Sequence, residues 1–324
     1  MRHFFSEEDL FQILTPYDWL HRPDKECTYS FSPKPGEGFQ ISINYLREHK
    51  YKDRANKLIE TSKNNGLPKI HNFYQLDDFV SKNGLICRMW VKKQASKFIK
   101  VSITAMNIDE HLEQVNKCLE SFRIVKPNKV DHVKRWYKFG KFLEGMAAMM
   151  AVLNKSLENK CYIESVCAYT NLIDAYLRCA LILKNQIKNR NKDLDIRWIY
   201  QGIDDKPISE KMTYKEAFEE GIINEKQKTT LDTLYNERNR VIHRFIISEI
   251  SYFDIEDISC QHNKLFEEIW QIVKDLEDEQ IALNVGMTKQ VETDIKDFDY
   301  QMFIKEKLES FTLLKHSSSN YSKK

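Results

Sequence analysis

The sequence predicts an α+β protein in which a small antiparallel-sheet domain precedes an all-helical bundle. Apolar and polar residues alternate with period two only within the first 125 residues. From residue 135 onward, apolar residues instead recur every three or four positions. Pro127 and a polar run divide the two patterns. We therefore expect an α+β domain at 1–126, a five-helix bundle at 135–283 and a C-terminal extension with a polar tail at 284–324.

The sheet of the first domain is predicted from three segments. Phe39–Tyr45 alternates apolar and polar residues and follows a turn rich in proline and glycine at 33–38. Leu85–Val91 and Phe98–Ala105 have the same character, and a polar turn at 92–97 joins them. These segments indicate three half-buried strands.

Helices are expected beside this sheet at 52–63 and 109–121, and Ser6 followed by Asp9 fits the cap of a short first helix. The order of elements, closing with Glu120–Ile124, resembles the PsbP-like family of small α/β domains. No histidine, cysteine or carboxylate cluster in this half has catalytic spacing. The domain is therefore expected to bind or to scaffold rather than to catalyse.

The second domain begins after a predicted polar linker at 128–134. Two long helices follow from stripes of apolar residues at helical spacing. The first stripe is Trp136, Phe139, Phe142, Leu143, Met146, Met149, Met150 and Leu153, and the second is Tyr162, Val166, Tyr169, Ile173, Tyr176, Leu177 and Ala180. Stripes of this kind are typical of a packed core.

The third predicted helix is short. Thr213 with Glu216 forms a capping-box pattern at its start, and Gly221 provides a stop.

Two further helices complete the predicted bundle. Asn224 with Gln227 fits the cap of a fourth helix running to about residue 248, and a fifth is expected near 263–282. The C-terminal extension contains one more predicted helix at 303–314.

Composition narrows the class of protein. The chain of 324 residues has 50 basic and 48 acidic side chains, which argues against a polybasic coat for nucleic acid but permits a local basic cluster. Its seven cysteines are scattered without a C-x-x-C pair, which disfavours disulfides and zinc and fits a reducing cytoplasm. The first residues have no apolar core of signal-peptide length, and no uninterrupted apolar run approaches the roughly 20 residues that span a bilayer. We expect a cytoplasmic protein without a membrane segment.

The segment Glu237–Phe245 in the fourth helix carries the candidate chemistry. The apolar stripe passes through Leu231 and Leu234, and its next position is Arg238. A guanidinium on such a stripe is costly unless it is paired or opens into a cleft. Asn239 and His243 are four residues apart and share a neighbouring face.

Arg238 and His243 are five residues apart, or about 140° around an ideal helix. One helix therefore does not aim both side chains at one phosphate. Two chains related by a two-fold axis can pool these residues across their interface. The spacing thus predicts a site built by a homodimer.

Arg238-Asn-Arg-Val-Ile-His243 matches the R-N-x-x-x-H form of the motif of HEPN domains. Ala168–Arg178, Phe218–Ile223 and Leu231–Asn239 also resemble that family. The resemblance implies a helical bundle that dimerises. It also implies a metal-independent endoribonuclease of the kind found in toxins, phage-defence systems and CRISPR effectors. Arg238 and His243 would then be the catalytic pair, with Asn239 supporting them.

The chemistry of this site would use the 2′-hydroxyl of RNA as nucleophile. His243 is suited to act as general base or acid. Arg238, aided by Arg240 and Arg244, is suited to hold the phosphate and stabilise its developing charge. The expected products are a 2′,3′-cyclic phosphate and a 5′-hydroxyl, formed without metal or cofactor.

At one position the sequence differs from the pattern of a subgroup of the family. HEPN toxins paired with a nucleotidyltransferase antitoxin carry a tyrosine two residues after the histidine. Phe245 stands at that position here and has no hydroxyl to modify. Control by nucleotidylation at that position is therefore not expected.

Three functions follow from these patterns. The first is an endoribonuclease whose N-terminal domain senses a regulatory ligand or protein. The second is a non-catalytic HEPN-like module that binds RNA or a protein, with Arg238 and His243 at a dimer interface. In the third, the helical half supports a functional N-terminal domain. A motif match alone does not decide among them.

Overall fold

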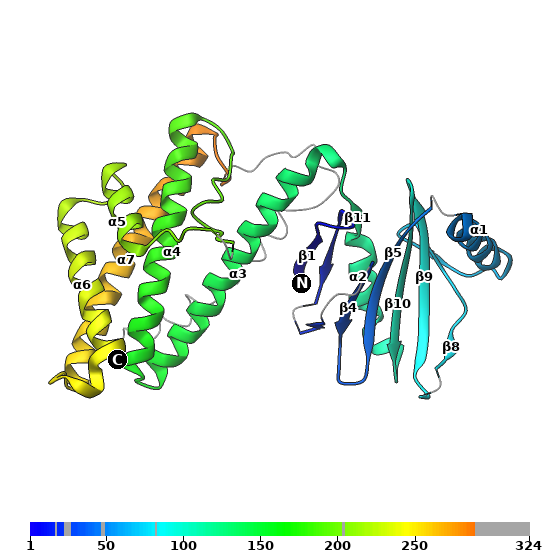
Figure 1. Cartoon of the computed structure of the whole chain (residues 1–324), viewed down its shortest axis with the longest axis horizontal. Coiled ribbons are helices and arrows are strands. Elements are labelled where there is room, and N and C mark those ends of the chain that lie inside the picture. Colours follow the sequence, from blue (N-terminus) through cyan, green and yellow to red (C-terminus); the bar gives the residue numbers. More distant parts are fainter. Residues whose placement is uncertain (17, 23–26, 47–48, 82, 203–204, 289–324) are drawn as a thin grey trace. The chain divides into compact units, whose positions relative to one another are not determined.

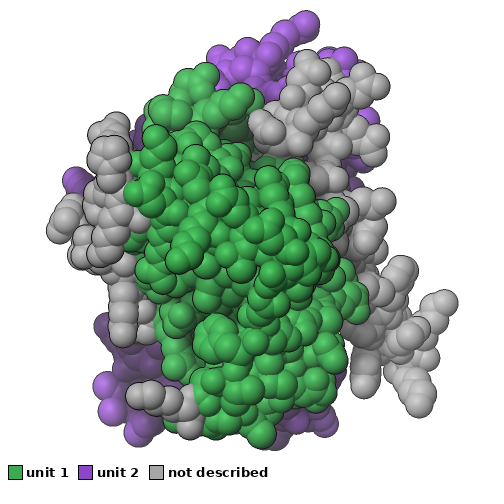
Figure 2. All heavy atoms as spheres, turned by 90° about the vertical axis from the view of Figure 1, so that its right-hand side faces the viewer, with its two compact units in different colours: residues 1–137 green, residues 138–324 purple. Residues whose placement is uncertain are grey.

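The computed structural model describes residues 1–16, 18–22, 27–46, 49–81, 83–202 and 205–288. The chain divides into two compact units, residues 1–137 and 138–324 (Figure 2). Antiparallel sheets occupy the first unit and helices the second, which confirms the predicted α+β class. The helix predicted at 303–314 lies outside the described residues.

Two antiparallel sheets form the N-terminal unit. The smaller has the order β1-β2-β11, with β1 at Arg2–Ser6, β2 at Phe11–Thr15 and β11 at Arg123–Ile124. The larger has the order β3-β4-β5-β10-β9-β7-β6, and β8 also pairs with β9. Its strands are β3 Leu20–His21, β4 Thr28–Ser32, β5 Gly38–Tyr45, β6 Lys69–Ile70, β7 Phe73–Gln75, β8 Phe79–Val80, β9 Ile86–Gln94 and β10 Lys97–Ala105.

Helices cover both faces of the larger sheet (Figure 1). On one face, alternate residues of β5 such as Ile41 share a core with Val115 of α2, Leu112–Ser121, which follows the 3-10 helix η1, Ile108–His111. On the other face, Ala55 of α1, His49–Asn64, packs with Val91 and Phe98. The three predicted strands and two predicted helices of this unit are therefore confirmed, with shifted ends.

Two local predictions in this unit are wrong. The residues around Ser6 form β1 and a turn instead of a capped helix, because β1 pairs along its length with β2. The polar segment 92–97 is mostly strand, since β9 runs to Gln94 and β10 begins at Lys97. Only Ala95 and Ser96 lie between the strands, and Ala95 has a φ of 50°.

The predicted linker at 128–134 is also wrong. A 3-10 helix, η2, spans Pro127–Lys129, with the proline in its first turn, where its missing N–H costs nothing. The long helix α3, Val130–Glu158, follows directly. The polar residues of this segment are therefore the first turns of a helix.

The helical unit contains α4 at Tyr162–Asn189, α5 at Glu210–Glu219, α6 at Glu225–Arg244, the 3-10 helix η3 at Phe245–Ile247 and α7 at Tyr252–Leu283. Helix α4 packs along α7, and α5 and α6 pack against α4 (Figure 1). The five predicted helices are present, although α7 begins eleven residues before the predicted start at 263.

Helix caps explain where these helices begin. The capping box of Asn224 and Gln227 is confirmed at the start of α6. The capping box predicted at Thr213 is wrong, because Ser209 caps α5 and Thr213 is buried within the helix. Gly221 has a φ of 67° just after α5, as expected for a helix stop.

Helix α4 is the one helix of the described residues that is long and apolar enough to cross a membrane. Within its most apolar window, 72% of the helix is buried inside the structure. Burial of this extent is what the central helix of a bundle shows.

Candidate functional site

Helix α6 carries all five candidate residues: Arg238, Asn239 and His243 of the motif, and Arg240 and Arg244. Leu231, Leu234 and Val241 are buried and fix its apolar face against the bundle. Its N-terminus is held by the capping box, and its C-terminus passes directly into η3. The position of each motif side chain around this helix therefore follows from the packing of those three residues.

Arg238 lies on the packed side of α6. An Nη of Arg238 donates to the Oε2 of Glu210 at 2.5 Å, and the two side chains are 17% and 26% exposed. The guanidinium also lies 5.0 Å from the centre of the Tyr235 ring. Its Nε is buried and has no partner among the described residues. Arg238 is thus held by an ion pair and a ring contact, with part of its donor capacity unused.

Glu210 is the residue that sequence reasoning missed. It is the first residue of α5, where a carboxylate also interacts favourably with the helix dipole. Burial raises the pKa of Glu210, the charge of Arg238 opposes that rise, and the charge of Asp174 adds to it. Tyr214 donates to the same carboxylate at 3.5 Å. No sequence pattern links Glu210 to Arg238, because the pair forms only when α5 packs against α6.

His243 lies on the exposed side of α6, and so does Arg244. Neither takes part in a hydrogen bond or ion pair within the described part of the chain. Arg240 is exposed and donates to both carboxylate oxygens of Glu237, at 2.9 and 2.7 Å. Asn239 is half-buried. These side chains are accessible to a ligand without disturbing the packed face of the helix.

The structure does not bring Arg238 and His243 into contact within one chain. Arg238 points to α5 and His243 is exposed, in line with the 140° separation expected for five residues. Arg238, Asn239 and His243 therefore do not form a complete site in a single chain.

Several large apolar side chains close to His243 in the sequence are exposed. Ile246 and Ile247 of η3 are 94% and 83% exposed, and Phe253 at the start of α7 is 79% exposed. Ile242 and Tyr252 are 38% and 43% exposed. We call these five residues the apolar patch. Exposed apolar side chains of this size are candidates for protein–protein contacts.

A cavity of about 800 Å³ lies elsewhere in the helical unit, between α3, α4 and the segment 196–208. Asp174 and Arg178 of α4 line it and form an ion pair at 2.7 Å. Arg178 also donates to the carbonyl oxygens of Trp198 at 3.0 Å and Ile208 at 2.8 Å. This arginine therefore anchors the chain segment that leads to α5 and Glu210.

Groups of side chains suited to metal binding are absent from the described residues: no three His, Cys, Asp or Glu side chains are placed to hold an ion. The exposed Cys260 and the other six cysteines are free thiols.

Comparisons with known proteins identify no family. No protein family and no curated protein matches the sequence. Among solved structures, the chain is similar to a crystal structure from Bacteroides thetaiotaomicron VPI-5482, with 12% identity and a TM-score of 0.30. The alignment covers 54% of this chain and 76% of the other.

Proposed function

We propose that this protein is a metal-independent endoribonuclease of the HEPN type, with its site on α6. The observation that carries the proposal is the state of the three motif residues. His243 is exposed and has no partner among the described residues, Asn239 is half-buried one turn before it, and Arg238 is held by Glu210 of the neighbouring helix α5. The helix thus combines a histidine able to transfer protons with one arginine held in place and two exposed arginines, as RNA cleavage requires.

In this proposal His243 takes the proton from the 2′-hydroxyl or gives one to the leaving 5′-oxygen. Arg244 and Arg240 contact the RNA backbone from the exposed face. Arg238 donates to the phosphate through the Nη that does not bond to Glu210. Asn239 orients the histidine or donates to a phosphate oxygen. The products are a 2′,3′-cyclic phosphate and a 5′-hydroxyl.

A homodimer completes the site. In the chain, Ile242 precedes His243 and Ile246 and Ile247 follow it, so a second copy docking on the apolar patch would bring the two α6 helices together. Each phosphate would then meet Arg238 and His243 from different chains. This arrangement removes the geometric obstacle that one helix presents.

The biological setting that fits this activity is a cytoplasmic toxin or phage-defence effector restrained by its N-terminal unit. Expression of the wild type, but not of His243→Ala, should then arrest growth with loss of RNA. Equal growth of both strains at equal protein levels would exclude that setting.

The direct experiment incubates the purified chain with single-stranded RNA in EDTA and follows cleavage on denaturing gels. Wild type should cut and leave 2′,3′-cyclic phosphate ends, and His243→Ala should lose at least about a hundredfold in rate. His71→Asn is the matched control, because His71 is exposed in the N-terminal unit and asparagine tolerates its φ of 47°. Cleavage retained by His243→Ala would exclude His243 as acid or base.

A second function is favoured by the Arg238–Glu210 pair. Because a carboxylate already engages Arg238, the residue also fits a structural role in a non-catalytic module that binds RNA or a protein. In that case wild type should bind without cutting at any concentration. Substituting Arg238 and His243 together should then alter binding or dimerisation.

A further inference from the structure

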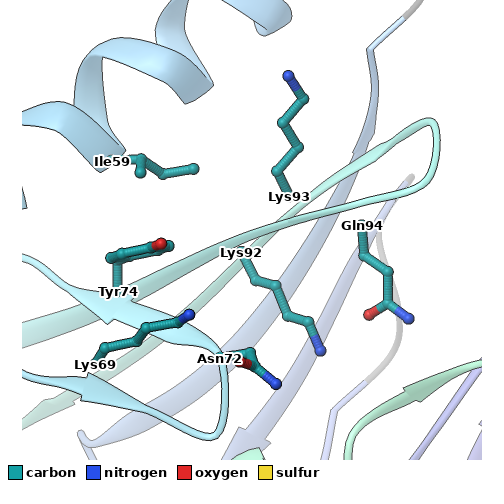
Figure 3. Close-up of a pocket in the computed structure, with 7 residues that line it drawn as sticks. All are labelled: Ile59, Lys69, Asn72, Tyr74, Lys92, Lys93 and Gln94. Atoms are coloured by element: carbon teal, nitrogen blue, oxygen red, sulfur yellow. The ribbon is translucent and has the colours of Figure 1, made fainter.

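The N-terminal unit contains a cavity of about 490 Å³ at the edge of its larger sheet (Figure 3). Helix α1 borders it on one side, and the β6–β7 and β9–β10 hairpins border it on the others. Its polar lining consists of Lys69, Asn72, Tyr74, Lys92, Lys93 and Gln94. A volume of this size lies within the range of small-molecule sites, about 300–1,000 Å³.

The cavity exists because β7 pairs with β9 only from Tyr74 onward. At this end of the pairing, Tyr74 lies opposite Val91. Before β7, His71 and Asn72 turn the chain, with φ values of 47° and 67°. Beyond Val91, β9 continues to Gln94 with β10 on one side only, among the described pairings. The last residues of β9 therefore present an open strand edge to the cavity.

Three lysines surround this opening. Lys92 and Lys93 are neighbours on β9 and extend to opposite faces of the sheet, while Lys69 extends from β6 (Figure 3). The Nζ of Lys69 lies 5.1 Å from the centre of the Tyr74 ring, and that of Lys93 donates to Asn56 at 3.3 Å. No carboxylate is among the residues that line the cavity.

The surroundings of Lys92 show that this positive charge is uncompensated. Burial lowers the pKa of Lys92, and the charges of Arg123 and Lys69 lower it further. Its ammonium lies 5.1 Å from the centre of the Phe73 ring, and none of the described carboxylates contacts it within hydrogen-bond distance. Repulsion between neighbouring cations without acidic partners raises the free energy of the site, and a bound anion relieves this repulsion.

Gln94 adds unused hydrogen-bonding capacity. Its side-chain Oε1 is buried and has no partner among the described residues. The amide of Asn72 lies at the opposite rim of the cavity (Figure 3). Amides in these places can bond the neutral parts of a ligand whose charge the lysines hold.

We propose that this cavity binds a phosphate-bearing small molecule of nucleotide size, with Lys69 and Lys92 contacting its phosphate oxygens. Asn72 and Gln94 complete the contacts, and Tyr74 forms part of the wall. The site involves no residue of the helical unit. Binding at this site is a function separate from the proposed ribonuclease activity, and the proposal holds whether or not the protein cuts RNA.

The test is a calorimetric titration of the full chain with inorganic tripolyphosphate and, separately, with ATP, in buffer without divalent cations. The variant is Lys69→Gln with Lys92→Gln. The matched control is Lys57→Gln with Lys126→Gln, which removes the same charge from exposed positions outside the cavity. Thermal unfolding of each variant establishes that it is folded.

Wild type and control should bind both probes with a single site, and the cavity variant should bind at least about tenfold more weakly. Tighter binding of ATP than of tripolyphosphate assigns a nucleoside phosphate, and equal binding assigns recognition of the phosphates alone. Absence of binding by wild type, or equal binding by the folded cavity variant, would overturn the proposal.

Discussion

Replacing Arg238 with methionine should destabilise the helical unit by about 2–3 kcal/mol. Exposed ion pairs contribute about 0–1 kcal/mol, whereas removing one partner of a buried pair costs about 3–5 kcal/mol. The Arg238–Glu210 pair is 17% and 26% exposed, so it lies between these cases and nearer the buried one. The substitution keeps an unbranched side chain but leaves Glu210 partly buried without its cation.

Glu210→Gln should cost less, about 1 kcal/mol, because a glutamine oxygen can still accept from Arg238. It also removes the carboxylate whose pKa burial raises. The double variant should then be more stable than the sum of the single costs predicts, by about 1–2 kcal/mol. Arg240→Met is the control, since Arg240 is 51% exposed and pairs with Glu237 one turn away. Its cost should stay below about 0.5 kcal/mol.

Native-state hydrogen exchange measured on peptides from α5 and α6 assigns these costs to the helical unit alone. A cost for Arg238→Met no larger than that for Arg240→Met would refute the structural role of the ion pair. Cleavage assays on the same proteins separate structure from chemistry. Loss of cleavage in Arg238→Met but not in Glu210→Gln means that Arg238 contacts RNA.

Four further predictions concern the apolar patch, two glycines and a buried histidine. Ile246 and Ile247 are 94% and 83% exposed, so replacing both with serine should not lower the unfolding temperature. In sedimentation experiments the same variant should shift from dimer to monomer. An unchanged dimer would place the interface elsewhere. Gly286→Ala should cost about 2–3 kcal/mol in denaturant unfolding, because φ is +74° and the new Cβ would lie 2.2 Å from a buried glutamine. Gly145→Ala, in a helix with open space, should instead stabilise by about 0.5–1 kcal/mol. Burial lowers the pKa of His262 below 6.5, so its contribution to stability is present above about pH 6.5 and is lost as the pH falls. Melting curves between about pH 7 and about pH 5.5 should therefore depend less on pH in His262→Asn, and an equal dependence would contradict this.

Sequence patterns predicted the central strands well because alternation reports directly on a sheet face. They failed near the N-terminus, where Ser6 and Asp9 fit a helix cap. The hydrogen bond from the Asp9 N–H to the Ser6 Oγ does form, at 3.1 Å, but within a turn between two strands. A local side-chain bond of this kind serves caps and turns alike, and the pairing of β1 with β2 decides between them.

The starts of the helices are likewise not decided by local side-chain signals alone. Ser209 and Thr213 are both acceptable caps, and only the burial of Thr213 within α5 excludes it. The capping box of Ser251 and Asp254 marks the start of α7, but the polar His262 interrupts the apolar stripe between Ile258 and Leu265.

The candidate site could be located from sequence but not assembled. The broken stripe correctly placed Arg238 on the packed side of α6 and implied that it needs a partner. The identity of that partner depends on how α5 packs, 28 residues earlier in the chain. The apolar patch was equally hidden, because residues 245–247 continue an apolar helical pattern while the chain tightens into a 3-10 turn.

The anchoring by Arg178 has a consequence for protein engineering. One guanidinium binds the carbonyl oxygens at residues 198 and 208, so both ends of the intervening segment are tied to α4. A doubling of such a loop costs only about 0.6 kcal/mol in closure entropy. Because the second anchoring contact, at residue 208, lies before Ser209, an insertion between residues 198 and 208 leaves the start of α5 in place. This segment is therefore a suitable position for a fluorescent reporter or affinity peptide that must not disturb Glu210.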